Sequence, residues 1–242
     1  MKIDYAIMSS NDNPLYLDFW EPVSKCWESL GIKPILFYFG NKDIKDDRVI
    51  KINKSTLYPE EIQTLWIRYF APKLLDSDKT SIISDIDMLP LSEFYFKDQL
   101  SSIHEDSYVH INPCIESYGR IPSCYHVAKN KKFVEILQLD KYNSFEDSLS
   151  ECLKYKENGN GWFADENFAT KLIKDSKSKD ILLIPRDGGQ GGHRIDRITN
   201  DLFLNFDISK ISSGYYYDCH SIRPYPKYKK LIDLIVTQFL QR

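Results

Sequence analysis

The sequence of 242 residues has few features of a membrane, secreted or nucleic-acid-binding protein. No apolar run approaches the ~18 residues of a membrane-spanning helix, and residues 1–20 lack the charged and apolar segments of a secretory leader. The net charge is −3, without any long basic run, so no nucleic-acid partner is expected. These absences predict a cytoplasmic protein without a membrane span.

Cysteine is scarce, and the spacing of the cysteines does not indicate a set of disulfide bonds. The chain has five cysteines, an odd number, and no C-x-x-C pair. Neither a zinc site nor a set of disulfides is therefore expected, and the pattern favours a reducing compartment.

The composition is that of a folded globular protein, with 42% hydrophobic and 28% charged residues. This balance argues against disorder, because disordered chains combine low hydrophobicity with high charge. Aromatic residues make up 14%, including 16 tyrosines. Tyrosine combines an apolar ring with a polar tip, so it suits both a core and a wet cleft.

The first 90 residues alternate between strand and helix patterns. Asn13 and Pro14 predict the cap and first position of a helix that ends at Gly31, and Pro59 opens a second helix. Continuous apolar runs predict strands over 4–9, 35–39, 49–52 and 81–84. Strands of this kind, separated by helices, are typical of a parallel sheet that is covered on both faces.

The second half of the chain is more mixed, and it contains no repeat and no linker. We expect strands over 108–111, 124–127 and 181–184, and helices over 130–138, 144–156, 164–175 and from Pro226 onward. The whole pattern predicts an α/β fold with a mainly parallel central sheet flanked by helices, in one domain over residues 1–242.

Two acids follow the apolar strand in the stretch TSIISDIDMLPLS, residues 80–92. Asp85 and Asp87 lie at the carboxyl end of that strand, where open parallel sheets bind ligands. In extended backbone they point the same way, and they repel each other unless a cation lies between them. Magnesium and manganese prefer oxygen ligands and suit a diphosphate. The alternative is that Asp85 caps a turn and Asp87 is solvated.

With three other segments, this D-x-D motif resembles the GT-A fold glycosyltransferases, which use nucleotide-sugar donors. Residues 68–75 (RYFAPKLL) are similar to the R-Y-x-x-P-x-L-L helix that precedes the motif, and residues 5–11 to the first strand and nucleoside-binding loop. Residues 218–225 resemble the C-terminal metal-histidine segment. The family's extra glycine and longer spacing are absent there, and the basic residue is Arg223, which can neutralise phosphate as lysine does.

The resemblance implies a Rossmann-like GT-A fold with a nucleotide-binding half, 1–90, and an acceptor-binding half, 91–242. It implies a metal-dependent transferase that moves a sugar from a nucleotide-diphosphate donor, with a UDP-sugar as the first expectation, to a glycan or other hydroxyl acceptor. The implied cofactor is Mn²⁺ or Mg²⁺, held by Asp85, Asp87 and His220. The implied donor-binding residues are Ser9, Asn11, Arg68, Ser84, Ile86, Ser123 and Arg223.

A second acidic site follows a Gly-Asn-Gly turn, in the stretch WFADENF at residues 162–168. Asp165 and Glu166 are acids of a helical first turn, which the helix dipole favours. The resemblance implies instead an acid in the acceptor cleft, with Asp165 as the better match and Glu166 as the second candidate. Such an acid is the general base of an inverting enzyme, or it orients the sugar in a retaining one.

The stretch PRDGGQGGHR, residues 185–194, has four glycines in five residues and predicts a mobile loop. It lacks the G-K-[ST] of a P-loop. Two interpretations stay open, a plain surface loop or a lid that carries Arg186, His193 and Arg194 over the diphosphate or acceptor. His110 and His126 alternate with apolar residues and are expected in the core or the cleft wall.

Two rival functions remain. A sugar-1-phosphate nucleotidyltransferase shares the general fold, but such enzymes carry a glycine-rich basic loop after the first strand, where this chain has SSNDN at residues 9–13. The other rival is a non-catalytic carbohydrate-binding protein on the same fold. The presence of all three candidate metal ligands counts against it.

Overall fold

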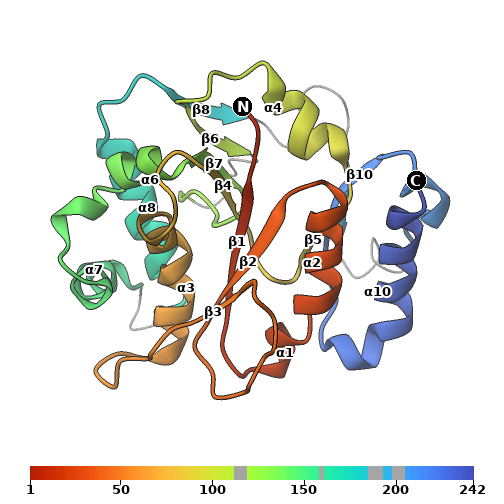
Figure 1. The fold of residues 1–242 in the computed structure, drawn as a ribbon, viewed down its shortest axis with the longest axis horizontal. Helices are drawn as coiled ribbons and strands as arrows, with labels where there is room; N and C mark the ends of the chain where they lie inside the picture. The colour runs from red at the N-terminus through yellow and green to blue at the C-terminus, as the bar shows by residue number, and fades with distance from the viewer. Residues whose placement is uncertain (112–118, 158–160, 185–192, 198–204) are drawn as a thin grey trace.

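The computed structural model describes residues 1–111, 119–157, 161–184, 193–197 and 205–242 (Figure 1). The strands are β1 (Tyr5–Ser10), β2 (Lys33–Tyr38), β3 (Val49–Lys51), β4 (Thr80–Ile83), β5 (Met88–Pro90), β6 (Tyr108–Ile111), β7 (His126–Lys129), β8 (Ile181–Ile184), β9 (His193–Asp196) and β10 (Tyr216–His220). The α-helices are α1 (Pro14–Leu17), α2 (Trp20–Ser29), α3 (Glu60–Phe70), α4 (Gln99–Ser101), α6 (Asn130–Ile136), α7 (Phe145–Cys152), α8 (Ala164–Asp175) and α10 (Tyr225–Leu240). Short 3-10 or π segments are Ala71–Leu74, Phe94–Asp98, Leu139–Lys141, Leu153–Tyr155 and Ile208–Lys210.

A seven-stranded sheet in the order β3-β2-β1-β4-β7-β6-β8 forms the centre of the molecule. Only β7 runs antiparallel to its neighbours, β4 and β6. The prediction of a mainly parallel sheet is therefore confirmed, and each predicted strand is present, with β7 beginning two residues later than expected. The carboxyl ends of β1 and β4 lie side by side, because Ile7 pairs with Ile83.

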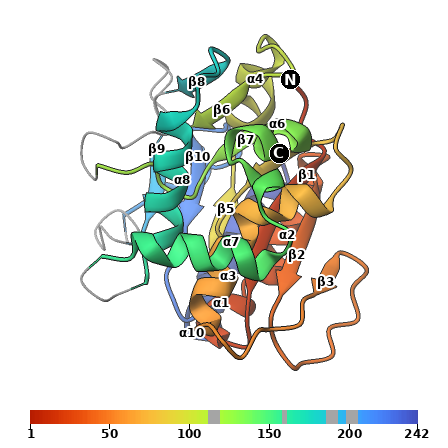
Figure 2. The same cartoon turned by 90° about the vertical axis from the view of Figure 1, so that its left-hand side faces the viewer.

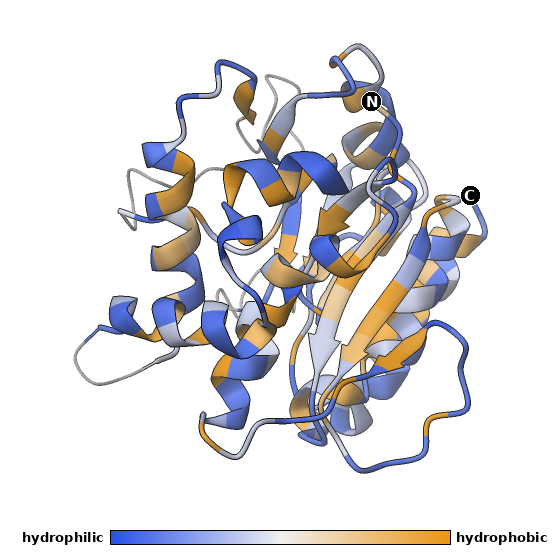
Figure 3. Cartoon of the chain, turned by 60° about the vertical axis from the view of Figure 1, so that its left-hand side comes forward, coloured by the Kyte–Doolittle hydropathy of each residue, from blue (hydrophilic) through white to orange (hydrophobic). Residues whose placement is uncertain are grey.

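Helices cover both faces of this sheet, as Figure 1 shows. The helices α2 and α10 pack together on one face. On the other face lie α3, α6, α7 and α8, which Figure 2 shows from their own side. The strands are hydrophobic, and the helices are hydrophilic where they face outward (Figure 3). No helix within the described ranges is long and apolar enough to cross a membrane.

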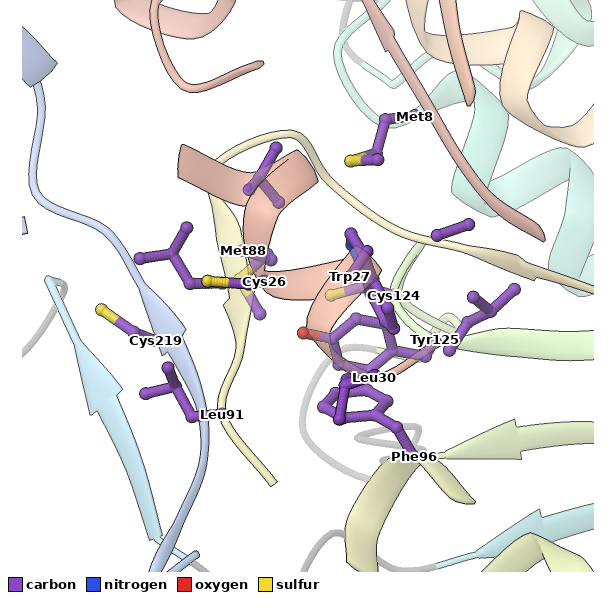
Figure 4. Packing of buried hydrophobic residues seen from close by; sticks show 14 of the residues in the cluster. Met8, Cys26, Trp27, Leu30, Met88, Leu91, Phe96, Cys124, Tyr125 and Cys219 are labelled. Atoms are coloured by element: carbon purple, nitrogen blue, oxygen red, sulfur yellow. The ribbon is translucent and has the colours of Figure 1, made fainter. Parts of the chain in front are cut away.

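The predicted first helix divides into α1 and α2. Asn13 caps α1, since its side chain accepts a hydrogen bond from the Leu15 backbone N–H at 3.0 Å. A turn at residues 18–19 then separates the helices. Helix α2 ends as predicted at Gly31, whose φ of +73° lies in the left-handed region that favours glycine. One face of α2 is buried. On this face the Trp27 ring makes edge-to-face contacts with the rings of Phe96 and Tyr125 (Figure 4).

A second, three-stranded sheet in the order β5-β10-β9 was not predicted. Its strands are three to five residues long, too short for a clear alternation of apolar and polar residues. Its register places His220 opposite Met88 on one side and opposite Asp196 on the other. This sheet therefore brings the end of the chain beside the D-x-D segment.

Buried charges hold the small sheet to the rest of the protein. Asp218 of β10 accepts two hydrogen bonds from the Arg194 guanidinium, at 2.7 and 2.6 Å, and one from the Tyr125 hydroxyl at 2.9 Å. Arg194 therefore lies in a buried ion pair on strand β9, which does not agree with a place on a mobile lid. Arg186 of the same predicted loop lies outside the described residues.

We expect Asp218→Asn to lower the free energy of unfolding by ~3–5 kcal/mol, because it leaves the Arg194 cation buried without a counter-charge. Asp207→Asn is the matched control: Asp207 is about half exposed, so the same substitution should change stability by less than about 0.5 kcal/mol. Denaturant unfolding measures both variants. Equal stability of the two variants contradicts a structural role for the Arg194–Asp218 pair.

Candidate functional site

A cavity of about 490 Å³ lies beyond the carboxyl ends of β1 and β4. Its walls come from the loop after β1, helix α3, the D-x-D segment, residues 120–124, the beginning of α8 and the small sheet. The lining residues are Ser9, Ser10, Asn11, Asn13, Tyr16, Glu61, Thr64, Leu65, Arg68, Asp85, Ile86, Asp87, Arg120, Pro122, Ser123, Cys124, Trp162, Phe163, Asp165, Glu166, Arg194, Asp196, Arg197 and His220. Most residues that the sequence singled out therefore meet in one place.

The guanidinium of Arg68 lies at the bottom of this cavity. Its Nη1 donates to the Asp85 carboxylate, and its Nη2 lies 3.2 Å from both the Ser123 hydroxyl and the Asp165 carboxylate. Burial lowers the pKa of Arg68, but the two carboxylates outweigh burial and hold that pKa above its usual value. The cation therefore joins α3 to three separate segments of the chain.

Asp87 is enclosed to a greater extent than the sequence predicted. Residues 86–87 form a turn, so the expectation that two extended residues point the same way is wrong here. Asp87 is 3% exposed; its carboxylate accepts a hydrogen bond from Arg197 and lies 3.6 Å from Nε of Arg223. Burial opposes ionisation, but Arg197, His220 and Arg223 outweigh it and lower the pKa of Asp87.

His220 lies at the end of β10, next to Asp87. Its Nδ1 is 3.1 Å from the Asp196 carboxylate. Since an ionised carboxylate only accepts hydrogen bonds, Nδ1 donates this bond, and in the neutral tautomer with the proton on Nδ1 the Nε2 atom has a lone pair. A carboxylate that orients a histidine in this way is typical of metal-binding histidines.

The charges around the cavity fit a bound cation, although no three acidic, histidine or cysteine side chains form a ready metal site in the described part of the chain. The two D-x-D carboxylates contact arginines instead. The lining contains six carboxylates and four guanidinium groups. The carboxylate oxygens are ligands of the kind that Mg²⁺ or Mn²⁺ prefers.

Asp165 begins helix α8 and is 1% exposed. Its Oδ2 faces Arg68, but its buried Oδ1 has no hydrogen-bond partner among the residues that the structure describes. Burial raises the pKa of Asp165 to about 7, which the attraction of Arg68 only partly offsets. Arg68 also pairs with Asp85, so the positive charge of Arg68 does not fully compensate the carboxylate of Asp165.

Both oxygens of Glu166 already have partners. One accepts from the Ser123 backbone N–H at 3.0 Å, and the other from Nε of Arg120 at 2.8 Å. Arg120 also covers the ring of Phe163, with 3.6 Å from its guanidinium carbon to the ring centre. The arrangement suits a residue that fixes the cavity wall more than one that exchanges a proton.

The other predicted donor-binding residues differ in their relation to the cavity, and two of them, Ser84 and Arg223, are not among its lining residues. Ser9 donates a hydrogen bond to the Thr64 carbonyl at 2.5 Å, and Asn11 and Ile86 also line the cavity. Ser84 is buried below the surface, where its hydroxyl donates to the Asp85 carbonyl at 3.1 Å. Arg223 stands behind Asp87, with its guanidinium 4.5 Å from the Tyr16 ring centre.

The sequence analysis did not identify Asp196, Arg197 or Arg120 as site residues. The first two follow the glycine-rich stretch in HRIDR, residues 193–197, whose alternation around Ile195 is a weak strand signal. Arg120 has no local signal, since its contact with Glu166 joins positions 46 residues apart. His110 and His126 are both buried core residues near the wall of the cavity, as expected.

No protein-family model matches the chain, and no curated protein does. Solved structures do match. GlyE from Streptococcus pneumoniae TIGR4, a glycosyltransferase, gives a TM-score of 0.56 at 13% identity, over 99% of this chain and 61% of GlyE. The galactosyltransferase LgtC, solved with donor and acceptor sugar analogues, gives 0.54 at 9% identity over 95% of each chain. Mouse xyloside xylosyltransferase 1 gives 0.50 at 8% identity, over 91% of this chain and 98% of that one.

The chain thus spans less than two thirds of GlyE but nearly all of LgtC. At such low identities the likeness concerns the arrangement of strands and helices. The mainly parallel seven-stranded sheet flanked by helices is the fold of the GT-A glycosyltransferases.

Proposed function

We propose that this chain is a glycosyltransferase that moves a sugar from a nucleotide-diphosphate donor to a hydroxyl acceptor. The observation that carries the proposal is Asp165, a lining residue of the cavity whose buried Oδ1 has no hydrogen-bond partner among the described residues. A buried oxygen left unpaired costs about 1–3 kcal/mol. Sugar hydroxyl groups are donors that satisfy such an oxygen. The shared fold of three solved glycosyltransferases supports the same conclusion.

The nucleoside end of the donor is assigned to the segment from the end of β1 to α1, where Ser9, Asn11 and Tyr16 line the cavity. The diphosphate is assigned to the region of Asp87, where the guanidinium groups of Arg197 and Arg223 lie. A UDP-sugar remains the first donor to test.

Transfer of the sugar requires that the negative charge of the departing nucleoside diphosphate is stabilised. A divalent ion, Mn²⁺ or Mg²⁺, held by Asp85, Asp87 and His220 would neutralise the departing nucleoside diphosphate. Asp196 would orient His220 for this task through the hydrogen bond to Nδ1. Arg68 and Arg197 contact the two aspartates in the described structure and would share them with the ion.

The transfer joins the acceptor oxygen to the anomeric carbon and breaks the bond from that carbon to the diphosphate oxygen. The nucleoside diphosphate leaves with the bonding electron pair, and the acceptor hydroxyl loses its proton. Asp165 would act at this junction. As a base with a pKa near neutrality it would accept the proton in an inverting enzyme, and in a retaining enzyme its free oxygen would orient the donor sugar.

The central experiment incubates the protein with a panel of nucleotide sugars and Mn²⁺ and measures the slow release of nucleoside diphosphate. A transferase hydrolyses its own donor in this way when no acceptor is present. A sugar-1-phosphate nucleotidyltransferase would instead release pyrophosphate from a nucleoside triphosphate and a sugar phosphate. A non-catalytic carbohydrate-binding protein would do neither.

Asp85→Asn should lower donor hydrolysis roughly a thousandfold or more, because the diphosphate loses an anionic ligand of its metal. The Asp85 side chain is about one third exposed, and Asp165 still faces the Arg68 cation in this variant, so the fold should persist. Asp78→Asn, at a fully solvated ion pair with Lys131, is the control that should retain wild-type activity. Undiminished activity of Asp85→Asn, or of wild-type protein in EDTA, would refute the metal site.

Asp165→Asn should lower turnover by about two to four decades, the usual range for general acid–base groups. Calorimetry with the nucleoside diphosphate and Mn²⁺ should show binding similar to wild type, since the carboxylate is assigned to the sugar. If nucleotide affinity collapses together with turnover, Asp165 belongs to the nucleotide site and the assignment is wrong.

The pH dependence of stability tests the state of Asp165. The folded pKa of Asp165, about 7, lies above the usual aspartate value, so the folded state binds the proton more tightly than the unfolded chain. The resulting contribution to the free energy of unfolding is complete below about pH 4 and is lost as the pH rises through 7. From pH 5 to 8, Asp165→Asn should gain stability relative to wild type by roughly 1 kcal/mol or more. A difference that stays constant over this range would contradict a folded pKa of Asp165 near 7.

A further inference from the structure

The outer end of the cavity carries an exposed aromatic side chain. Trp162 lines the cavity and is 44% exposed, whereas the other three tryptophans, Trp20, Trp27 and Trp66, are at most 7% exposed. The removal of an indole from water is favourable, so a half-exposed tryptophan at the rim of a cavity is a surface for a ligand.

Helix α3 forms one long wall of the cavity. Glu61, Thr64, Leu65 and Arg68 all line it, and their spacing of three, four and seven places them on one face of the helix. Arg68 is buried beside Asp165, whereas Glu61 is exposed. Seven residues of helix span about 10 Å. This length leaves room for a sugar ring between the reacting centre and the outer rim.

The segment before α8 contacts the first turn of α3, and this contact brings Trp162 close to that turn. Gly161 packs against Ile62 so closely that a Cβ atom on the glycine would lie 2.3 Å from Cδ1 of Ile62. Glu61 precedes Ile62 in the same turn. Trp162 and Glu61 therefore border the cavity from the two segments that meet at this contact.

The aromatic wall is also anchored to the centre of the site. Phe163 follows Trp162 and packs under the guanidinium of Arg120, and Glu166 holds Arg120 by a bond of 2.8 Å. Asp165 comes two residues after Phe163. A ring placed on Trp162 consequently lies at the entrance to the carboxylate that we assign to the sugar–acceptor junction.

We propose that Trp162 and Glu61 form the acceptor subsite and that the acceptor is a neutral saccharide. A pyranose ring has an apolar C–H face, which suits an indole surface, and a rim of hydroxyl groups, which donate to a carboxylate. The carboxylate of Glu61 disfavours an anionic acceptor at this position, because like charges repel. This inference rests on the proposed function and names its acceptor class.

The first test uses intrinsic fluorescence with three neutral disaccharides, lactose, cellobiose and maltose, in the presence of the nucleoside diphosphate and Mn²⁺. At least one should change the emission in a saturable way. Trp20→Phe, which removes a buried indole outside the cavity, should keep the change, and Trp162→Phe should abolish it. No saturable change with any of the three sugars, or a change that survives in Trp162→Phe, overturns the proposal.

The second test measures binding without relying on the fluorophore. Saturation-transfer NMR measures the affinity for the responding disaccharide. This affinity should fall at least tenfold in Trp162→Ala and severalfold in Glu61→Gln, while Trp20→Phe binds like wild type. Glucuronic acid should bind more weakly than the neutral sugar. Unchanged affinity in Trp162→Ala, or stronger binding of the anionic sugar, contradicts the subsite.

Hydrolysis of the donor without acceptor separates this inference from the proposed function. If wild-type protein hydrolyses a nucleotide sugar but its binding of disaccharides is independent of Trp162, the subsite alone is wrong. If disaccharides bind at Trp162 but no donor is hydrolysed, the subsite stands and the transferase function fails in favour of a carbohydrate-binding protein.

Discussion

The site depends on one buried cation, the guanidinium of Arg68. It contacts Asp85 after β4, Ser123 in the segment before β7, and Asp165 at the beginning of α8. A buried charge without partners costs several kcal/mol, so the fold must keep these partners close. The same requirement brings the D-x-D segment and the second acidic segment to opposite sides of one side chain, and thereby defines the bottom of the cavity.

Three aspartates of the cavity show how surroundings set the role of one residue type. Asp87 is buried among Arg197, Arg223 and His220, and its pKa is lowered. Asp165 is equally buried, but it shares its single arginine with Asp85, and its pKa is raised to about 7. Opposite shifts in neighbouring carboxyl groups are characteristic of sites that separate a charged binding group from a proton-exchanging one. The division of labour under the proposed function follows from this contrast.

The small sheet determines what surrounds Asp87. Strand β10 pairs with β5 and β9 in a register that puts His220 between the end of the D-x-D segment and Asp196. Arg197 follows directly after β9 and contacts Asp87. The buried pair of Arg194 and Asp218 holds these strands together. Stability of the sheet and geometry of the candidate metal ligands are therefore linked.

The sequence alone determined the elements that depend on local order. Continuous apolar runs specified the strands of the central sheet, and Asn13, Pro14 and Gly31 specified where helices begin and end. It also pointed to Asp85 and Asp87, because acids after an apolar strand are visible locally, whereas Asp165 and His220 were singled out through the resemblance to the GT-A glycosyltransferases. Only the tertiary structure decided that Asp87 is enclosed by arginines, that both oxygens of Glu166 are already hydrogen-bonded, and that Asp196 and Arg120 line the cavity. These facts depend on strands of a few residues and on contacts between positions 24 to 110 apart, for which the local sequence carries no signal.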